Sequence, residues 1–471
     1  MTGLEDLSAR VRDDLEKLNF GQPTWLAPRA QDGAAVLDVL IIGGGQSGLG
    51  AAFGLLRERI SNILVIDENP EGEEGPWETY ARMVTLRTPK HLTAIDLGIP
   101  SLTFRAYWEA LHGKAAWQAL DKIPRAAWMA YLRWYRAVLA LPVVNLTRAR
   151  LIEPLQNGFY KVHLEGPGAP SAALIARKVV LATGIQGGGE WQVPSMIRNA
   201  LPKDRYGHSS GPIDYAVLKG KRIAILGGGA SAFDNANFAL AQGVAEAHVF
   251  VRRAKPQRIN PIRFMERSNF IAGYATLSDA EKYQVMATFL ARNQPPTNDT
   301  YARAKAWPCF VLHVGEWHRC TDTAQGVHIA TSCGDFLFDY LVLATGLVSD
   351  PALRPELSLL AKDILLWRDV YQAPEDLRNR LIDIHPYLAA DFAFQGRDPE
   401  AAVRLQGLYV FNYSALVSQG LSAAALSGLR YALPRLVDGI AKALFRDERE
   451  TLLAAYHAYD EIEFTGQWES P

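Results

Sequence analysis

The stretch that most constrains the fold is VLDVLIIGGGQSGLG at residues 36–50. An apolar run typical of a buried strand is followed by Gly43, Gly45 and Gly48 in the spacing G-x-G-x-x-G. In such a loop the first glycine permits a tight turn, the second lets the backbone approach a pyrophosphate, and the third lets the next helix pack on the strand. The stretch therefore predicts a strand–turn–helix unit that binds a dinucleotide at the helix N-terminus.

The rest of such a unit follows in order. A second apolar run, Ile63 to Ile66, ends at Asp67 and Glu68. Asp67 lies 19 residues after the last glycine of the motif, where an acid binds the ribose hydroxyls. The predicted contacts of this first site are Gly43, Gly45, Gln46, Ser47, Gly48, Asp67 and Glu68.

The pattern recurs at residues 221–232, KRIAILGGGASA, as G-x-G-x-x-A. Two copies of one module about 180 residues apart indicate two dinucleotide sites. The predicted contacts of the second site are Gly227, Gly229, Ala230, Ser231 and Ala232.

The two copies differ where the second strand ends. The second copy has Arg252 and Arg253 where the first has acids. A guanidinium suits the 2′-phosphate of NADPH, whereas a carboxylate would repel it. We therefore predict FAD at the first site and NADPH at the second, the alternative being that the arginines only solvate a strand end.

Two strands that end in Ala-Thr-Gly, at residues 178–184 and 339–346, bracket the second module. They place Thr183 and Thr345 among the predicted cofactor contacts. The predicted fold is α/β, with two Rossmann-like domains and the NADPH domain inserted into the FAD domain. The predicted limits are 1–210 for the first part of the FAD domain, which begins with an amphipathic helix, 211–335 for the NADPH domain, and 336–471 for the rest.

Two further segments are candidates for the site. The segment after Glu68 is rich in Gly, Pro and Thr and has little periodicity, and long irregular segments are often functional. Trp77 and Arg87 are its predicted cofactor contacts, although a plain surface loop is the alternative. Near the C-terminus, Gly420 and Leu421 are predicted to begin a small-residue helix that faces the flavin, or that simply packs closely.

Composition excludes several classes of function. The net charge is −1 and no stretch of eighteen apolar residues occurs, so neither a nucleic-acid surface nor a membrane span is predicted. The first eighteen residues are charged, which predicts no signal peptide. The three cysteines form no C-x-x-C and no zinc-type spacing, which predicts no metal site and a reducing, cytoplasmic location. The sequence does not determine the oligomeric state, and a homo-oligomer is one of the alternatives.

Over residues 36–440 the ordered set GGGQSG, GPW, ATG, HSS, GGGASA, RR and ATG resembles the class B flavin-dependent monooxygenases. That group comprises flavin-containing monooxygenases, Baeyer–Villiger monooxygenases and microbial N-hydroxylases. MVTLRTP and QGLSAAALS are similar to segments of the N-hydroxylases. The F-x-G that precedes the fingerprint histidine of Baeyer–Villiger enzymes is replaced by Pro202, Lys203 and Asp204, and RTPK stands where flavin-containing monooxygenases have T-N-x-S-K.

The resemblance implies a reaction. NADPH reduces FAD, the reduced flavin forms a C4a-peroxyflavin with O2, and one oxygen atom passes to a small organic substrate, with nitrogen or sulfur favoured as the acceptor. His208 would act near the nicotinamide. Absence of C-x-x-C argues against dithiol-linked reductases. A ferredoxin reductase-like electron carrier and a non-catalytic nucleotide sensor are the alternatives.

Overall fold

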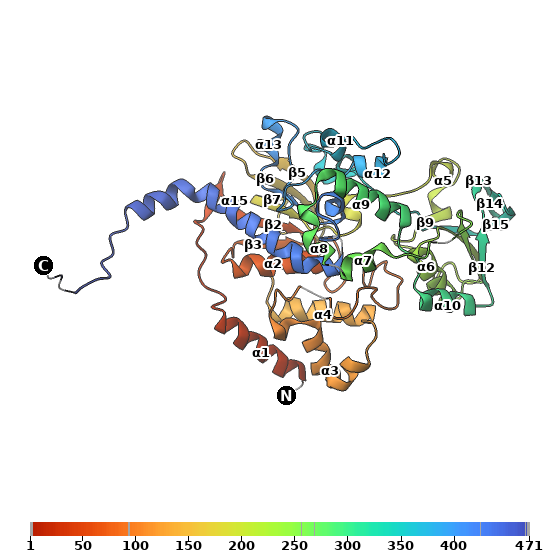
Figure 1. Cartoon of the computed structure of the whole chain (residues 1–471), viewed down its shortest axis with the longest axis horizontal. Coiled ribbons are helices and arrows are strands. Elements are labelled where there is room, and N and C mark those ends of the chain that lie inside the picture. The colour runs from red at the N-terminus through yellow and green to blue at the C-terminus, as the bar shows by residue number, and fades with distance from the viewer. Residues whose placement is uncertain are drawn as a thin grey trace.

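The computed structural model describes residues 3–92, 95–255, 257–267, 269–423, 425–466 and 468. Two sheets with mostly parallel strands organise the chain, and each carries helices on its faces (Figure 1). The predicted α/β class with two Rossmann-like domains is confirmed. Because the chain leaves the first sheet after β7 (Ala173–Leu181) and returns to it at β18 (Leu408–Val410), the second domain is inserted into the first.

The first sheet has eight strands, of which the predicted glycine-motif strand β2 (Ala34–Ile42) is central. β2 pairs in parallel with β3 (Ile63–Ile66) and β7. Its residues from 38 to 42 are all buried, as expected of a strand covered on both faces. The remaining strands of this sheet are β1 (Arg29–Gln31), β4 (Val143–Val144), β5 (Arg148–Pro154) and β6 (Tyr160–Glu165).

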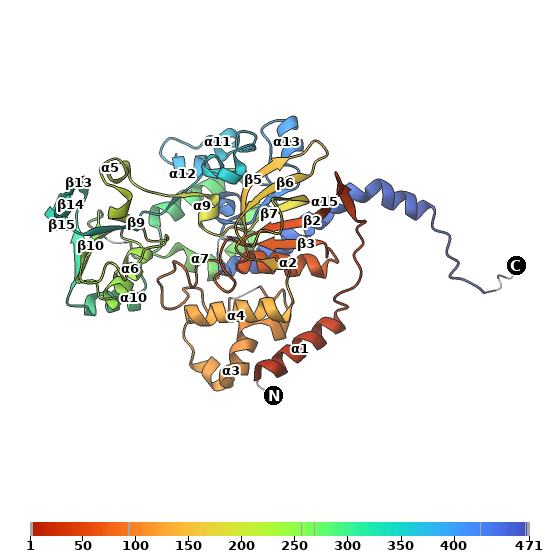
Figure 2. The same cartoon turned by 180° about the vertical axis from the view of Figure 1, so that it is seen from behind.

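Helices cover this sheet and extend the domain. α2 (Gln46–Arg57) follows the glycine loop and packs against α15 (Leu429–His457), the last helix of the chain. The N-terminal helix α1 (Gly3–Lys17) is amphipathic as expected and buries Leu7, Val11 and Leu15. Leu18, also expected on the apolar face, lies beyond the end of the helix and is exposed. It lies against α3 (Phe104–Ala119), beside which α4 (Arg125–Val138) runs (Figures 1 and 2).

The second sheet has the order β12-β11-β10-β16-β9. Its strands are β9 (Tyr206–His208), β10 (Arg222–Leu226), β11 (Glu246–Val251), β12 (Phe310–Val314) and β16 (Tyr340–Leu343). A separate three-stranded sheet comprises β13 (Trp317–Thr323), β14 (Gly326–Thr331) and β15 (Gly334–Phe338). β9 and β16 lie outside the predicted limits of 211–335, so we propose limits for the NADPH domain near residues 206 and 343.

Helices of the inserted domain and of the return segment complete the fold. They are α5 (Ser195–Arg198), α6 (Ala230–Ala241), α7 (Pro261–Arg267), α8 (Phe270–Gly273), α9 (Asp279–Arg292), α10 (Asn298–Ala306), α11 (Trp367–Val370), α12 (Arg380–Asp383), α13 (Pro399–Leu405) and α14 (Leu416–Gln419). The two short strands β8 (Gly189–Trp191) and β17 (Leu347–Ser349) pair antiparallel where the chain passes between the domains. In the described part of the chain, no helix has the length and apolarity that crossing a bilayer requires.

One predicted helix boundary is wrong. No helix begins at Gly420 and Leu421, because α14 ends there and Gly420 has a φ of 68°, a positive value that favours glycine and does not continue a helix. The next long helix, α15, begins at Leu429. Small residues in this segment therefore form a turn instead of the start of a helix.

Candidate active site between the two nucleotide-binding domains

A cavity of about 920 Å³ lies where the FAD domain meets the inserted domain. Its volume is at the upper end of the range of small-molecule sites, roughly 300–1,000 Å³. The glycine loop after β2, the irregular segment after β3, residues 210–212 and the turn before α15 all contribute to its wall. A cavity of this extent suits an elongated cofactor with a substrate at one end.

The glycine loop forms the part of the wall that fits a pyrophosphate. Gly43, Gly45, Gln46 and Ser47 line the cavity, and Gly45 is the N-cap of α2. A Cβ on Gly45 would meet the backbone of Gly75 at 3.8 Å, an ordinary van der Waals contact, so the loop is not closely packed at this position. A Cβ on Gly48 would lie 1.8 Å from the carbonyl oxygen of Gly43, which agrees with its predicted packing role.

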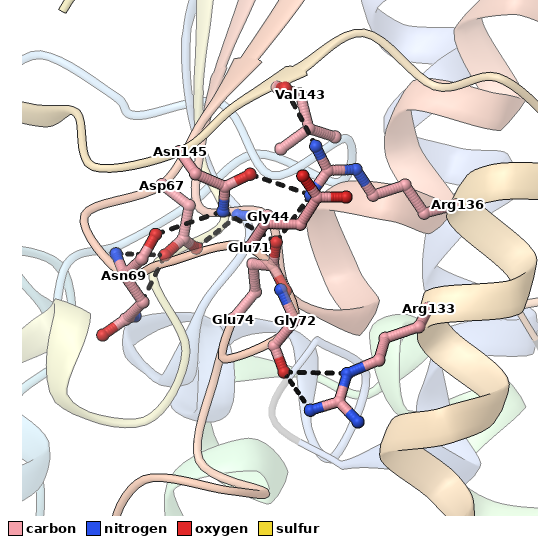
Figure 3. A network of polar contacts seen from close by, with 10 residues as sticks. All are labelled: Gly44, Asp67, Asn69, Glu71, Gly72, Glu74, Arg133, Arg136, Val143 and Asn145. Atoms are coloured by element: carbon pink, nitrogen blue, oxygen red, sulfur yellow. Dashed lines mark hydrogen bonds and ion pairs between the residues drawn. The ribbon is translucent and has the colours of Figure 1, made fainter. Parts of the chain in front are cut away.

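Asp67, the predicted ribose ligand, also holds the glycine loop (Figure 3). Its Oδ2 accepts a hydrogen bond of 2.7 Å from the backbone N–H of Gly44, and its Oδ1 accepts one of 2.8 Å from the N–H of Asn69. Burial raises the pKa of this carboxyl, and the hydrogen bonds oppose that shift. Glu68 also lines the cavity and is more exposed, with its carboxylate 3.4 Å from Arg148.

A polar network not foreseen from the sequence supports this loop (Figure 3). Arg136 on α4 pairs with the buried carboxylate of Glu74 at 2.7 Å and donates to Asn145 at 2.8 Å. On the same helix, Arg133 donates two hydrogen bonds to the carbonyl oxygen of Gly72. The network fixes the segment from 69 to 75, whose end lies against the glycine loop. The residues of this network come from separate segments of the sequence, so no local motif predicts it.

The second glycine motif lies at the start of α6. Gly229 is the N-cap, and Gly227 has a φ of 148°, where a side chain would meet the carbonyl of Ala344. Ala230, Ser231 and Ala232 form the first turn of α6, and Ala232 is fully buried. Arg252 and Arg253 are exposed directly after β11, and Arg253 donates to the carbonyl of Ala291 at 3.0 Å.

The other predicted contacts divide into two groups. Trp77, Arg87 and Thr183 line the cavity, and the Thr183 hydroxyl accepts a hydrogen bond from Asn412 at 3.0 Å. Thr345, Gly420 and Leu421 are not among the described lining residues. The Thr345 hydroxyl donates to the carbonyl of Gln192, Gly420 lies against the ring of Tyr274, and Leu421 is buried.

Further charged side chains border the cavity where α6 and α7 approach the irregular segment. Arg87, from the irregular segment, forms an ion pair with Asp234 of α6. Arg263 and Glu266 of α7 pair at 3.1 Å, and Arg263 also donates to the carbonyl of Arg87 at 2.8 Å. Asn260, Ala423 and Leu426 also line the cavity. Of these residues, the sequence indicated only Arg87.

Comparison with known proteins decides the family. Residues 40–186 match a family model described as FAD-NAD(P)-binding, and residues 116–296 match the L-lysine 6-monooxygenase/L-ornithine 5-monooxygenase model. The chain is 57% identical over 470 residues to the FAD-dependent urate hydroxylase of Xanthomonas campestris pv. campestris, covering 99% of this chain and 98% of the relative. The chain belongs to the class B flavin-dependent monooxygenases.

Solved structures of other monooxygenases share the fold. Ornithine hydroxylase from Pseudomonas aeruginosa is 19% identical, with a TM-score of 0.68 over 87% of this chain and 100% of that chain. Ornithine N-hydroxylase from Kutzneria sp. 744 is 17% identical, with a TM-score of 0.66 over 86% of this chain and 99% of that chain. FAD and NADPH are accordingly the cofactors of this monooxygenase, and the glycine loop, with Gly43 and Gly45 in the cavity wall, fits the pyrophosphate of the first.

His208 lies behind the cavity wall of this monooxygenase. Its ring stacks on Trp191, which lines the cavity, with centroids 4.7 Å apart. Its Nδ1 accepts a hydrogen bond of 3.2 Å from the N–H of Ser210, and burial lowers its pKa to about 4. The imidazole is therefore neutral at pH 7. We propose that it positions Trp191 and Ser210 and does not transfer a proton itself.

Proposed function

We propose that this monooxygenase hydroxylates urate or a close purine relative, with NADPH as reductant and O2 as oxidant. The support is the 57% identity to a FAD-dependent urate hydroxylase over almost the whole of both chains, together with the arrangement of charged side chains that line the cavity. Reduced flavin supplies the reactivity toward O2, and the protein binds, orients and shields. The form in which the flavin carries oxygen stays a prediction, as do a cytoplasmic location and a homo-oligomeric state.

The charge arrangement argues against a simple alkyl amine. Four acidic side chains are among the described lining residues, and each already has a partner: Asp67 with backbone donors, Glu68 with Arg148, Glu266 with Arg263 and Glu356 with Arg354. An alkylammonium ion would have to compete with an arginine for any of the last three. A purine carries carbonyl and N–H groups side by side. It can instead hydrogen-bond to a protein donor and a protein acceptor that adjoin each other, such as an arginine and its paired carboxylate.

The proposed roles of the cofactor residues follow from their positions. Gly43, Gly45 and the first turn of α2 would hold the FAD pyrophosphate, with Glu68 and Asp67 at the ribose. Arg252 and Arg253 would bind the 2′-phosphate of NADPH. Trp77 lines the cavity and would exclude water from it.

Oxidation at nitrogen or sulfur, favoured by the sequence motifs, would not apply to urate. Its ring nitrogens adjoin carbonyl groups that withdraw their lone pairs, so a ring carbon is the more electron-rich acceptor. Amine N-hydroxylation remains the second candidate, because the N-hydroxylases share the fold and the lysine/ornithine model matches residues 116–296.

The decisive experiment measures coupled turnover. Purified holoenzyme is supplied with NADPH under air, and NADPH loss, O2 loss and substrate loss are followed with urate, xanthine, ornithine, lysine or cadaverine. We expect urate to accelerate NADPH oxidation and to disappear in a 1:1 ratio with it. Acceleration by an amine and not by urate would contradict the proposal. Rapid electron transfer to a ferredoxin, with no substrate dependence, would instead indicate an electron carrier.

A further inference from the structure

We infer that Arg263 and Glu266 form the substrate-recognition pair of this monooxygenase and bind the edge of a cyclic ureide. In such an edge a ring carbonyl and a ring N–H stand side by side, as they do in urate. Arg263 would donate to the carbonyl oxygen or to a deprotonated ring nitrogen, and Glu266 would accept from the neighbouring N–H. The inference rests on the proposed function and adds the residues that select the substrate.

The position of the pair is the first argument. Arg263 and Glu266 line the same cavity as Glu68 and the glycine loop, where FAD is predicted to bind. They lie on α7, outside both glycine motifs, and have no predicted role in binding a cofactor. A substrate that enters the cavity beside the cofactor can therefore reach the pair.

The pair is also held in place before any ligand binds. Arg263 donates through Nη1 to Glu266 at 3.1 Å and through Nη2 to the carbonyl of Arg87 at 2.8 Å. Arg87 is itself fixed by its ion pair with Asp234. Because a guanidinium has five N–H groups, Arg263 keeps donors for a ligand after making these two contacts. Preorganised groups lose little entropy on binding.

Glu266 has acceptor capacity left after its contact with Arg263, because a carboxylate can accept more than one hydrogen bond. Its side chain is 4% exposed although it lines the cavity. Burial raises its pKa, and the charge of Arg263 opposes that shift. The buried hydroxyl of Ser427 lies near the carboxylate and also opposes that shift, although the geometry forms no hydrogen bond within 3.5 Å among the described residues. The carboxylate therefore has a serine hydroxyl as a further polar neighbour besides Arg263.

The chemistry of the pair selects against near relatives of the ligand. A site that hydrogen-bonds a particular N–H rejects an analogue lacking it, because its own buried group is then left unpaired. Methylation of one ring nitrogen both removes that N–H and adds bulk. The structure thus predicts that one monomethylurate is discriminated against far more strongly than its isomers.

Binding to the oxidised holoenzyme gives the test. Urate is titrated against FAD-loaded protein, and Kd is read from the flavin difference spectrum, alongside kcat and KM. We expect Arg263→Gln and Glu266→Gln each to raise Kd and KM about ten- to a hundredfold, with FAD content and the KM for NADPH unchanged. Arg267→Gln, at the exposed end of the same helix, is the matched control and should behave like wild type.

The methylurate series identifies the hydrogen bond. In wild type, one of the four N-methyl isomers should bind much more weakly than the others, and Glu266→Ala should remove that difference. Normal urate binding by both folded Arg263→Gln and Glu266→Gln, or an unchanged methyl profile in Glu266→Ala, would overturn the inference while leaving urate hydroxylation intact. Failure of the wild type itself to bind or turn over urate would instead overturn the proposed function, and this inference with it.

Discussion

Arg87 of the FAD domain and Asp234 of the inserted domain form an ion pair whose two side chains are 17% and 7% exposed. Arg87 belongs to the irregular segment that lines the cavity, and Asp234 lies on α6, directly after the second glycine motif. Burial raises the pKa of Asp234, and Arg87 opposes that shift. The pair thus fixes one wall of the cavity against the helix that begins the NADPH site.

Removal of one partner should loosen this contact. Asp234→Asn leaves the guanidinium without a counter-charge, and breaking a buried pair costs roughly 3–5 kcal/mol. We expect a lower free energy of unfolding in urea and slower reduction of bound FAD by NADPH under anaerobic conditions. Lys122→Ala is the control, because Lys122 and Asp299 pair at 2.9 Å between the same domains but are more exposed, and such pairs contribute about 0–1 kcal/mol. Equal effects of the two substitutions would contradict this reading.

Substitution of Gly45 by a residue with a larger side chain should prevent FAD binding. A valine there would add bulk between the glycine loop and Gly75 and would keep the pyrophosphate from the backbone, so the purified Gly45→Val protein should lack the yellow colour and most of its FAD. Gly273→Val is a suitable control, since nothing lies within 4 Å of the added Cβ and the φ of Gly273 is −83°. A folded Gly45→Val protein with full FAD content would show that the cofactor lies elsewhere.

Arg252 and Arg253 should determine the choice between NADPH and NADH. A charge-assisted hydrogen bond contributes roughly 1.5–3 kcal/mol, so loss of one should weaken NADPH about ten- to a hundredfold. NADH should be little affected and serves as the internal control. Of the two, Arg252→Ala should have the larger effect, because Arg253 already donates to Ala291. Steady-state kinetics of both variants with both cofactors checks this, and an unchanged NADPH/NADH ratio in both would refute it.

His208 should make the protein less stable as the pH falls. Its pKa in the fold is about 4 because it is buried, against 6.5 when unperturbed. The unfolded chain therefore takes up the proton first, so the stabilisation is present above pH 6.5 and is lost as the pH falls toward 4. Between pH 7 and pH 5 this histidine alone should lower the free energy of unfolding by about 2 kcal/mol. Urea unfolding of wild type and His208→Gln at both values measures it, and an equal pH response in the two proteins would contradict the assignment.

The sequence predicted the architecture because its strongest signals are local. A strand, three glycines and an acid occupy one short segment, and their repetition predicted the second domain and its insertion. The predicted boundary near residue 335 excluded β16, since a strand that ends in Ala-Thr-Gly occurs in both sheets and the motif does not say to which it belongs. The start of a helix at Gly420 was wrong because small residues favour a turn as readily as helix packing.

The proposed substrate-recognition residues could not be predicted from the sequence, for a different reason. Arg263 and Glu266 are three residues apart on a short helix and read as an ordinary surface ion pair. Only the fold brings them beside Arg87, which is 176 residues away in sequence. The same holds for Glu74, Arg136 and Asn145, which form one network from three separate segments.

The insertion has a consequence for synthesis on the ribosome. β18 and α15 complete the FAD domain, and every strand of the second sheet precedes them in the chain. Because domains fold as units during translation, the NADPH domain can fold while the FAD domain still lacks one strand, β18, and the helix that packs on α2. Nascent chains halted before residue 408 should therefore bind an NADPH-affinity resin and fail to retain FAD, which would make flavin capture the last step of maturation.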